Sequence, residues 1–472
     1  MTDSSGRAAA RASPDDRISR AEIRATLSLS SLFALRMLGL FIILPVFAVH
    51  ARTHLAGGES QVLIGIALGA YGLTQGALQI PYGMASDRYG RKRTIIVGLV
   101  LFALGSFIAA AASHIWLIIL GRVIQGTGAI SAPVVAFAAD LTREQHRTKA
   151  MALIGASIGL MFALSLVAAP ALYQFVGMGG IFLATGLLSL AGIWVTLKIV
   201  PPEPEQMDLS RRVESAKLGD VLRNPDMLRL NLGIFCLHMV QMAMFVVVPV
   251  SLVRAGLPLP GHWKVYLPVV LLSFALMIPP IIMAERRGRM KLMFVSAVAL
   301  MLAVQVGFAF FGEGIVPTAA LLLLFFVAFN VLEASLPSLV SRVAPSGARG
   351  TAIGVYNTTQ SLGLFVGGFA GGVLSQVWGN SAVFVFGAAF IALWLFVAFG
   401  MRAPGDITTR RFALGVRENL DELRLEDLRE RLVRLKGIRD VVFMPEEGAA
   451  LVTFFAERWD EQAAMELLRG KH

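Results

Sequence analysis

Long apolar runs recur along this chain, and each is long enough to cross the hydrocarbon core of a bilayer. A transmembrane helix needs about 20 predominantly apolar residues to cross a core of about 30 Å. The first half has such runs near 27–49, 62–83, 94–112, 115–139, 148–172 and 179–199, and the second near 227–252, 264–284, 291–311, 316–341, 350–376 and 381–400. Backbone groups find no water in lipid, so these runs must be helices. The sequence therefore predicts an all-α polytopic membrane protein with twelve transmembrane helices.

Positive charge is distributed unevenly between the loops. The chain has a formal charge of +11, and its basic residues gather at the N-terminus and after the second, fourth, sixth and eighth runs. The loops between carry only Arg52, Arg254 and Lys264. The positive-inside rule then places both termini in the cytoplasm. This loop pattern also explains the basic composition without nucleic acid as a partner, and we expect the lipid bilayer, protons and a small-molecule substrate instead.

The chain divides into two similar halves and an appended module. We expect a cytoplasmic tail over 1–25, a six-helix bundle over 26–200, a cytoplasmic linker over 201–225, a second six-helix bundle over 226–402 and a cytoplasmic module over 408–472. The run Asp-Arg-Tyr-Gly-Arg at 87–91 is matched by Glu-Arg-Arg-Gly-Arg at 285–289, after the second and eighth apolar runs. An internal repeat with a site between the halves is typical of secondary transporters.

The module has the composition of a soluble domain. Helices are predicted over 423–435 and 460–468 and strands over 411–416, 438–444 and 449–455, which gives βαββα, most of a ferredoxin-like fold. The module lacks the Cys-x-x-Cys of copper-binding relatives of that fold, and Cys236 is the chain's one cysteine, so we predict no metal site. Whether the module binds a ligand or associates with itself stays open; we expect the transporter to be a monomer.

The loop at 83–93 carries the clearest motif. It reads Gly-Met-Ala-Ser-Asp-Arg-Tyr-Gly-Arg-Lys-Arg and resembles the signature of the major facilitator superfamily, G-x-x-x-D-R-x-G-R-[KR]-x. The resemblance covers nearly all of the chain and extends to bacterial proton-driven efflux transporters with a C-terminal soluble module. It implies two pseudo-symmetric six-helix bundles in a bacterial inner membrane. It also implies alternating access powered by the proton gradient, without a cofactor.

The resemblance implies that this loop forms a cytoplasmic gate. Asp87 would lie beside the start of the eleventh span, near Gly350, where the helix dipole favours a carboxylate. Arg91 would pair with Asp140. The alternative is that the basic side chains of the loop only set topology against anionic lipid. The predicted gate residues are Gly83, Asp87, Arg88, Gly90, Arg91, Asp140 and Arg147.

Three ionisable residues inside apolar runs are candidates for proton coupling, since burying such a group costs roughly 3 kcal/mol on insertion scales. Glu333 is the leading candidate, because a desolvated carboxyl can exchange protons when it is exposed to alternating sides of the membrane. The alternative is a structural role, as a protonated or paired glutamate near Asn330 and Asn357. Arg122 stands in an Arg-x-x-Gln-Gly-x-Gly pattern that the family shares, and would either tune proton transfer or serve as a hydrogen-bonding hub. His238 titrates in a useful range but can equally pack between helices.

A predicted substrate cavity lies between the halves, as the family fold implies. Its residues are Arg36, Tyr71, Gln75, Gln79, Gln241, Phe245, Asn330, Asn357 and Gln360. Arg36 would bind an anion or balance charge, or act as a structural tie. A mostly apolar cavity with few fixed charges suits lipophilic or amphipathic compounds. The prediction is therefore drug/proton antiport.

Two other functions remain open. One is transport of a single metabolite such as a sugar or organic anion, with Arg36 as the anion site. The other is a membrane sensor that signals through the C-terminal module. The sequence contains neither an ATP-binding loop nor a nucleophile constellation, so we do not expect an enzyme.

Overall fold

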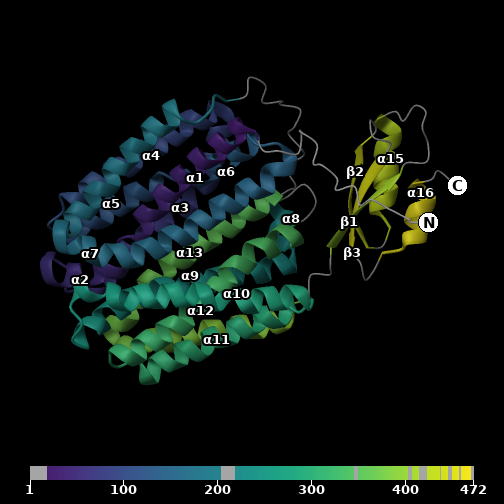
Figure 1. The fold of residues 1–472 in the computed structure, drawn as a ribbon. Coiled ribbons are helices and arrows are strands. Elements are labelled where there is room, and N and C mark those ends of the chain that lie inside the picture. Colours follow the sequence, from purple (N-terminus) through teal and green to yellow (C-terminus); the bar gives the residue numbers. More distant parts are fainter. Residues whose placement is uncertain are drawn as a thin grey trace, which may run out of the picture.

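A computed structural model of the 472-residue chain describes residues 19–203, 218–344, 349–401, 407–413, 422–435, 437–444, 449–455 and 459–468. Most of it is a bundle of long helices, and a small unit of strands and helices lies at one end of that bundle (Figure 1). The bundle comprises α1 (Arg20–Phe41), α2 (Leu44–His54), α3 (Gln61–Tyr89), α4 (Arg91–Ala110), α5 (Ile115–Thr127), α6 (Ser131–Asp140), α7 (Glu144–Lys198), α8 (Leu218–Arg223), α9 (Pro225–Arg254), the 3-10 turn η3 (Leu259–Gly261), α10 (Trp263–Arg286), α11 (Met290–Phe311), α12 (Ile315–Val343), α13 (Arg349–Val377) and α14 (Asn380–Phe399).

Two predicted spans are each interrupted once. The first is broken at Ile42 and Ile43, just before Pro45 in the first turn of α2. Proline lacks a backbone N–H and its ring clashes with the preceding turn, so the helix restarts there. The fourth span is broken between Thr127 and Ser131, where Gly128 leaves helical geometry. Each interruption divides a span without adding a membrane crossing.

Helix α7 is long enough for two spans and turns back on itself. Its 55 residues include Gly177, whose φ of 63° lies in the left-handed region that glycine adopts without steric cost. Both ends of α7 return to the start of α1. The Arg143 backbone N–H donates to Glu22 Oε1 over 3.0 Å, and Arg24 Nε donates to the Ile199 carbonyl over 2.8 Å. The predicted runs at 148–172 and 179–199 are therefore the two arms of this hairpin.

Ten helical segments of the described chain are long and apolar enough to cross a membrane. The segment Leu153–Lys198 counts once among them although α7 has two arms, and the 29-residue α13 is not among the ten. Large apolar side chains such as Leu160 and Phe396 are exposed on the outside of the bundle, at 63% and 78%. A protein surrounded by lipid needs such an apolar exterior.

Helix α13 joins the two halves of the bundle, because it packs along both α3 and α9. Glycines permit the close approach to α3, where Gly65 and Gly69 face Gly368 and Gly372. Small residues four apart let membrane helices pack backbone against backbone. We call this contact the α3–α13 seam.

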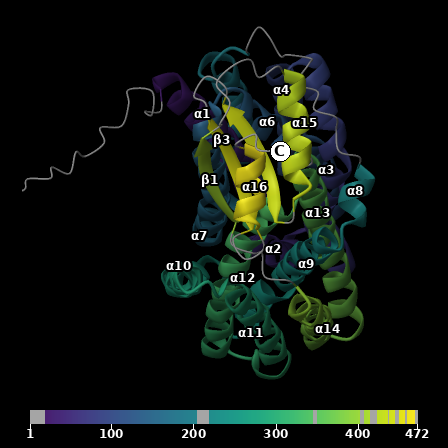
Figure 2. The same ribbon diagram turned by 90° about the vertical axis from the view of Figure 1, so that its right-hand side faces the viewer.

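The C-terminal unit has its own hydrophobic core. Antiparallel strands β1 (Ile407–Ala413), β3 (Ala449–Phe455) and β2 (Ile438–Met444) form a sheet in the order β1-β3-β2. Helices α15 (Glu422–Val433) and α16 (Glu461–Leu468) pack on one face of it (Figure 2). The first strand begins four residues before the predicted 411–416, whose last three residues lie outside the described chain. Phe412 at the strand's end packs with Phe454 and Trp459.

Candidate functional site

The predicted gate lies at one end of the bundle, which we call the Asp87 end. Arg91 is 8% exposed and is the first residue of α4. Its Nε donates to Asp140 Oδ2 over 2.9 Å, and its Nη1 pairs with Asp87. The helices join at Gly90, whose φ of 100° is a conformation that glycine accepts readily. Arg91 thus ties together the ends of α3, α4 and α6.

Within the described residues, this cluster makes no hydrogen bond or ion pair with α13. The Asp87 side chain is 67% exposed, and apart from the neighbouring backbone of α13 itself no described atom lies within 4 Å of a methyl group placed at Gly350 or Gly354. Gly83 is loosely packed, with Ala132 at 3.8 Å from such a methyl group. The expected contact belongs to the conformation in which this end is closed.

Arg88, another predicted gate residue, lies at the periphery of the cluster. Arg88 is exposed and lies over the ring of Tyr89, 5.4 Å from its centroid. The Arg147 side chain lies outside the part of the chain that the structure describes.

Two further polar contacts at the Asp87 end were not predicted. Glu22 is 5% exposed, caps the start of α1 with Ser19, and accepts hydrogen bonds from Arg143 Nε and Nη2, both over 3.1 Å. Glu203 accepts from the Lys92 backbone N–H over 2.7 Å. The sequence signal for Glu22 was the pattern Ser-x-x-Glu, a capping box. Nothing in that pattern identified the distant arginine.

The opposite end, which we call the Gln61 end, is closed by hydrogen bonds between the halves. Ser375 Oγ donates to Gln61 Oε1 over 2.5 Å, and the Val62 N–H donates to Gln376 Oε1 over 3.2 Å. Asn380 extends this contact, since its Oδ1 lies 2.8 Å from Ser375 Oγ. These groups connect the start of α3 to the end of α13 and the start of α14.

The α3–α13 seam is tight from the Gln61 end to mid-bundle. A methyl group added at Gly368 would lie 2.5 Å from the Gly65 carbonyl oxygen, and one at Gly72 would lie 2.8 Å from the Ser361 carbonyl oxygen. Around Gly350 and Gly354 the same helix has open space. In the described chain the seam is therefore tight from the Gln61 end to mid-bundle, and α13 is loosely packed around Gly350 and Gly354.

Two arginines and a tyrosine form the polar interior of the first half. The guanidinium carbons of Arg36 and Arg122 lie 5.8 Å and 4.7 Å from the centroid of the Tyr71 ring. Arg36 Nη1 hydrogen-bonds to Ser131, and Arg122 Nη1 donates to Gln125 Oε1 over 2.9 Å. Cation–π contacts of this kind compensate only part of the cost of burying a charge.

These arginines lack acidic partners in the described chain. Arg36 is 1% exposed and Arg122 is 0% exposed. In each side chain Nε and Nη2 are buried without a hydrogen-bond partner. Leaving buried charged donors unpaired is expensive.

The second half holds the candidate proton-coupling pair. His238 Nε2 lies 2.7 Å from Gln360 Nε2 and 3.7 Å from Glu333 Oε2. Glu333 Oε2 is buried without a hydrogen-bond partner, although the whole side chain is 28% exposed. Asn330 donates to Ser273 Oγ over 3.1 Å rather than to Glu333. The carboxyl group is therefore near His238 but not fixed by hydrogen bonds.

An aromatic cluster centred on Phe162 joins the halves. Its ring lies 5.0 Å from that of Phe41 and 6.3 Å from that of Phe245, between centroids. It also stacks with Phe329 at 5.9 Å, and Phe329 contacts the His238 ring at 5.7 Å. The cluster is an apolar connection between the first half and the His238–Glu333 pair.

The remaining predicted cavity residues are not tied into these clusters by described hydrogen bonds. Gln75 and Gln79 follow Tyr71 along α3, at helical spacings of four and eight, and are 7% and 3% exposed. Gln241 in α9 is 1% exposed, and Asn357 in α13 is half-buried. The carbonyl oxygens of the three glutamine side chains are buried without partners.

Comparison with known proteins gives the family. The model for the Major Facilitator Superfamily matches residues 29–368 and 282–456. The chain belongs to this superfamily. It is a multi-pass membrane transporter with the major facilitator fold.

Relatives and solved structures agree with that assignment. The chain is 42% identical to the inner membrane transport protein YajR of Escherichia coli, over 93% of this chain and 95% of that protein. It is 26% identical to the multidrug resistance protein MdtH of Aeromonas hydrophila, over 74% and 86%. A bacterial homologue of the human lysosomal transporter Spinster superposes with a TM-score of 0.67 at 13% identity, over 81% and 97%.

Proposed function

We propose that this transporter exports lipophilic or amphipathic compounds in exchange for protons, by alternating access. The observation that carries the proposal is the Glu333 carboxyl, which has a buried oxygen without a hydrogen-bond partner and lies 3.7 Å from His238. Ionisable side chains inside a membrane bundle form the proton relays of pumps and transporters. Multidrug resistance proteins among the relatives support export.

The proposed topology has twelve crossings. Counting the two arms of α7 separately and adding α13 to the ten apolar segments gives this number. The Asp87 end would face the cytoplasm of an inner membrane, together with both termini, since the basic loops lie there. Labelling of single cysteines at Glu59 and at Arg93 from outside intact cells tests this, and labelling at Arg93 alone would contradict it.

Purified protein in proteoliposomes tests proton coupling. A pH-sensitive dye should report proton flux when a transported lipophilic compound is added, and Glu333→Gln should abolish that flux. Glu313→Gln is the matched control, because Glu313 is exposed in the loop before α12. Unchanged flux in Glu333→Gln would remove this residue from the mechanism.

Transport of one specific metabolite, an organic anion, is the second candidate function. The observation that favours it is the set of unpaired guanidinium nitrogens on Arg36 and Arg122. A carboxylate accepts hydrogen bonds from such groups in a bidentate geometry. Thermal-shift screening separates the candidates, since one tightly bound anion supports the second and scattered weak apolar ligands support the first.

For the C-terminal unit we propose a ferredoxin-like module, from its strand order and its two helices on one face. If the protein acts as a sensor, deletion after residue 405 should leave transport intact and abolish a cellular response. Deletion that changes neither would make the module an appendage.

A further inference from the structure

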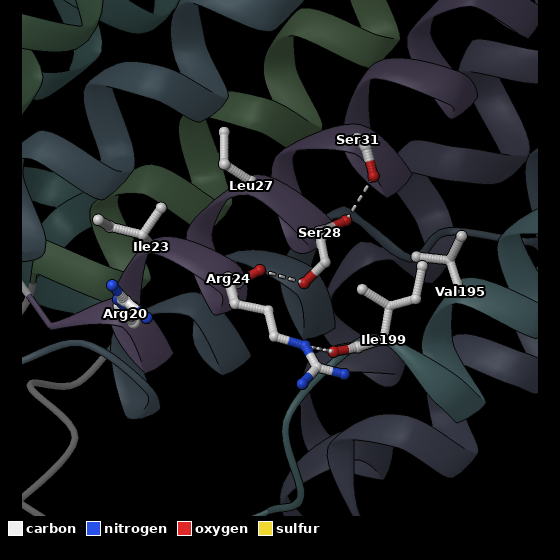
Figure 3. A pocket seen from close by; sticks show the side chains of 8 residues that line it. All are labelled: Arg20, Ile23, Arg24, Leu27, Ser28, Ser31, Val195 and Ile199. Atoms are coloured by element: carbon white, nitrogen blue, oxygen red, sulfur yellow. Dashed lines mark hydrogen bonds between the residues drawn. The ribbon is translucent and has the colours of Figure 1, made fainter.

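A hollow of about 530 Å³ lies between the start of α1 and the end of α7, at the Asp87 end (Figure 3). Its volume falls within the range of small-molecule sites, about 300–1,000 Å³. Residues from both helices line it, and the ones that matter here are Arg20, Ile23, Arg24, Leu27, Val195 and Ile199. This hollow is on the outside of the first half, away from the Glu333 and Arg36 clusters.

The spacing of the lining residues makes it amphipathic. Arg20, Ile23, Arg24 and Leu27 are separated by three and four residues, so they share one face of α1. With a rise of 1.5 Å per residue, Leu27 lies about 10 Å further along the helix than Arg20. Ile23 and Leu27 are 45% and 55% exposed. The hollow therefore has two basic groups at its mouth and an apolar wall deeper along the helix.

The polar groups inside the wall are already satisfied. Ser28 Oγ donates to the Arg24 carbonyl over 2.7 Å, and Ser31 Oγ donates to the Ser28 carbonyl over 2.7 Å (Figure 3). Val195 on α7 and Ile199, the residue that follows the end of α7, complete the apolar side. An aliphatic chain in this position would leave no polar group newly unpaired.

The Arg24 guanidinium group is held in place at the mouth. Its Nε donates to the Ile199 carbonyl over 2.8 Å, and its Nη2 donates to the Lys198 carbonyl over 3.1 Å. Its Nη1 has no hydrogen bond within the described chain. Arg24 therefore presents a fixed positive charge with one nitrogen available.

In the described part of the chain, nearby acidic side chains do not neutralise this charge. Glu22 is engaged by Arg143, and Glu203 accepts from the Lys92 backbone. Arg20 has no ion-pair partner in the described part of the chain, and Lys198 in the last turn of α7 adds a further positive charge. The mouth of the hollow has excess positive charge where an anionic group would enter.

We propose that this hollow binds an anionic phospholipid. Its phosphate would lie between Arg20 and Arg24, and one acyl chain would run over Ile23, Leu27 and the two apolar residues at the end of α7. Arginine is well suited to phosphate oxygens, and basic pockets between membrane helices attract anionic head groups. The exposed apolar wall fits a lipid tail better than a water-soluble anion.

Binding of fluorescent phosphatidylglycerol to the purified full-length protein in neutral detergent tests the proposal. Basic residues near a membrane surface contribute about 1 kcal/mol each. The double variant Arg20→Gln/Arg24→Gln should therefore bind phosphatidylglycerol about 30-fold more weakly. The matched control is Arg88→Gln/Arg93→Gln, which removes the same charge from exposed positions at the same end and should leave the affinity unchanged.

A second variant separates lipid from other anions. Leu27→Asp keeps both arginines but puts a carboxylate on the acyl-chain wall, and should also abolish lipid binding. If both arginine double variants lost the same amount of phosphatidylglycerol affinity, the proposal would be overturned in favour of general electrostatic attraction between the lipid and the basic end of the protein. Displacement of the lipid by inorganic phosphate at equal concentration would overturn it in favour of a simple anion site. If the double variant does not fold, Arg20→Gln alone replaces it in the binding assay, because it keeps the hydrogen bonds of Arg24 to the Lys198 and Ile199 carbonyls.

Discussion

Adding one methyl group to the α3–α13 seam should open the Gln61 end. In Gly368→Ala the new Cβ would lie 2.5 Å from the Gly65 carbonyl oxygen and 3.1 Å from the Gly69 nitrogen. Both neighbours are backbone atoms, so neither can move aside as a flexible side chain would. Overpacking of this kind typically costs about 1–3 kcal/mol.

That cost falls on the conformation in which the seam is tight. If the seam loosens when the Gln61 end opens, the closed-to-open ratio should fall by a factor of about 5 to 150, because 1.4 kcal/mol is a factor of ten. The hydrogen bonds of Gln61 and Ser375 would then separate more often. The change requires no substrate, since it acts on the resting equilibrium.

Distances between two spin labels measure this equilibrium. Cysteines at Glu59 and Trp378 are suitable because both side chains are exposed and lie at the Gln61 ends of α3 and α13. Cys236 is buried and is replaced by alanine in the background. Gly368→Ala should add or enlarge a long-distance population.

Gly354→Ala is the matched control on the same helix. No described atom lies within 4 Å of the added methyl group there, so the distance distribution should not change. If Gly368→Ala folds and its distances equal those of the parent, the seam does not control closure of the Gln61 end, and the reasoning fails.

Three smaller predictions concern single contacts. Glu22→Gln should lower the free energy of unfolding by about 1–3 kcal/mol in a thermal unfolding assay, because the ion pair of Glu22 with Arg143 is lost. The control is Asp226→Asn, which breaks the more exposed ion pair of Asp226 with Arg229 and should change the free energy of unfolding by less than about 1 kcal/mol. Gly177→Ala should cost about 1–2 kcal/mol in the same assay through its left-handed φ alone, since no described atom crowds it; an unchanged midpoint would mean that the α7 turn relaxes freely. Asp87→Asn should speed the labelling of a cysteine at Gly354 by disfavouring closure of the Asp87 end, and an unchanged rate would reject Asp87 as a gate residue.

The sequence predicted the helices better than their interruptions. Apolar length alone identifies a span, because the bilayer requires it. The break at Ile42 and Ile43 lies within an unbroken apolar run, where only Pro45 hinted at it. The α7 turn was bracketed by two predicted runs, but the helix is continuous on either side of Gly177.

Site residues were predictable where a motif places both partners. The resemblance paired Arg91 with Asp140, and the structure has them 2.9 Å apart. Pairings between unrelated segments were not predictable, as Glu22 with Arg143 shows. Such contacts depend on how distant helices pack. The expected contact of Asp87 with α13 depends further on conformation, since it requires the Asp87 end to close.

The charge on Glu333 also connects the sign of the substrate's charge to whether the substrate moves against the proton or together with it. The interior becomes more positive by one elementary charge when Glu333 takes up a proton. A cationic substrate would then bind better to the ionised form and compete with the proton, as exchange requires. An anion would bind better to the protonated form and travel with the proton. Linkage makes these effects reciprocal.

Substrate affinity measured against pH therefore distinguishes the two candidate functions. For proton exchange with a cation, affinity should rise as pH rises through the titration of Glu333, and Glu333→Gln should remove that dependence. For an anion held by Arg36 and Arg122, affinity should fall over the same range, and Arg36→Gln should weaken binding at every pH. A pH-independent affinity for both kinds of ligand would separate Glu333 from substrate binding, because a charge change within one cavity must act on a charged ligand there.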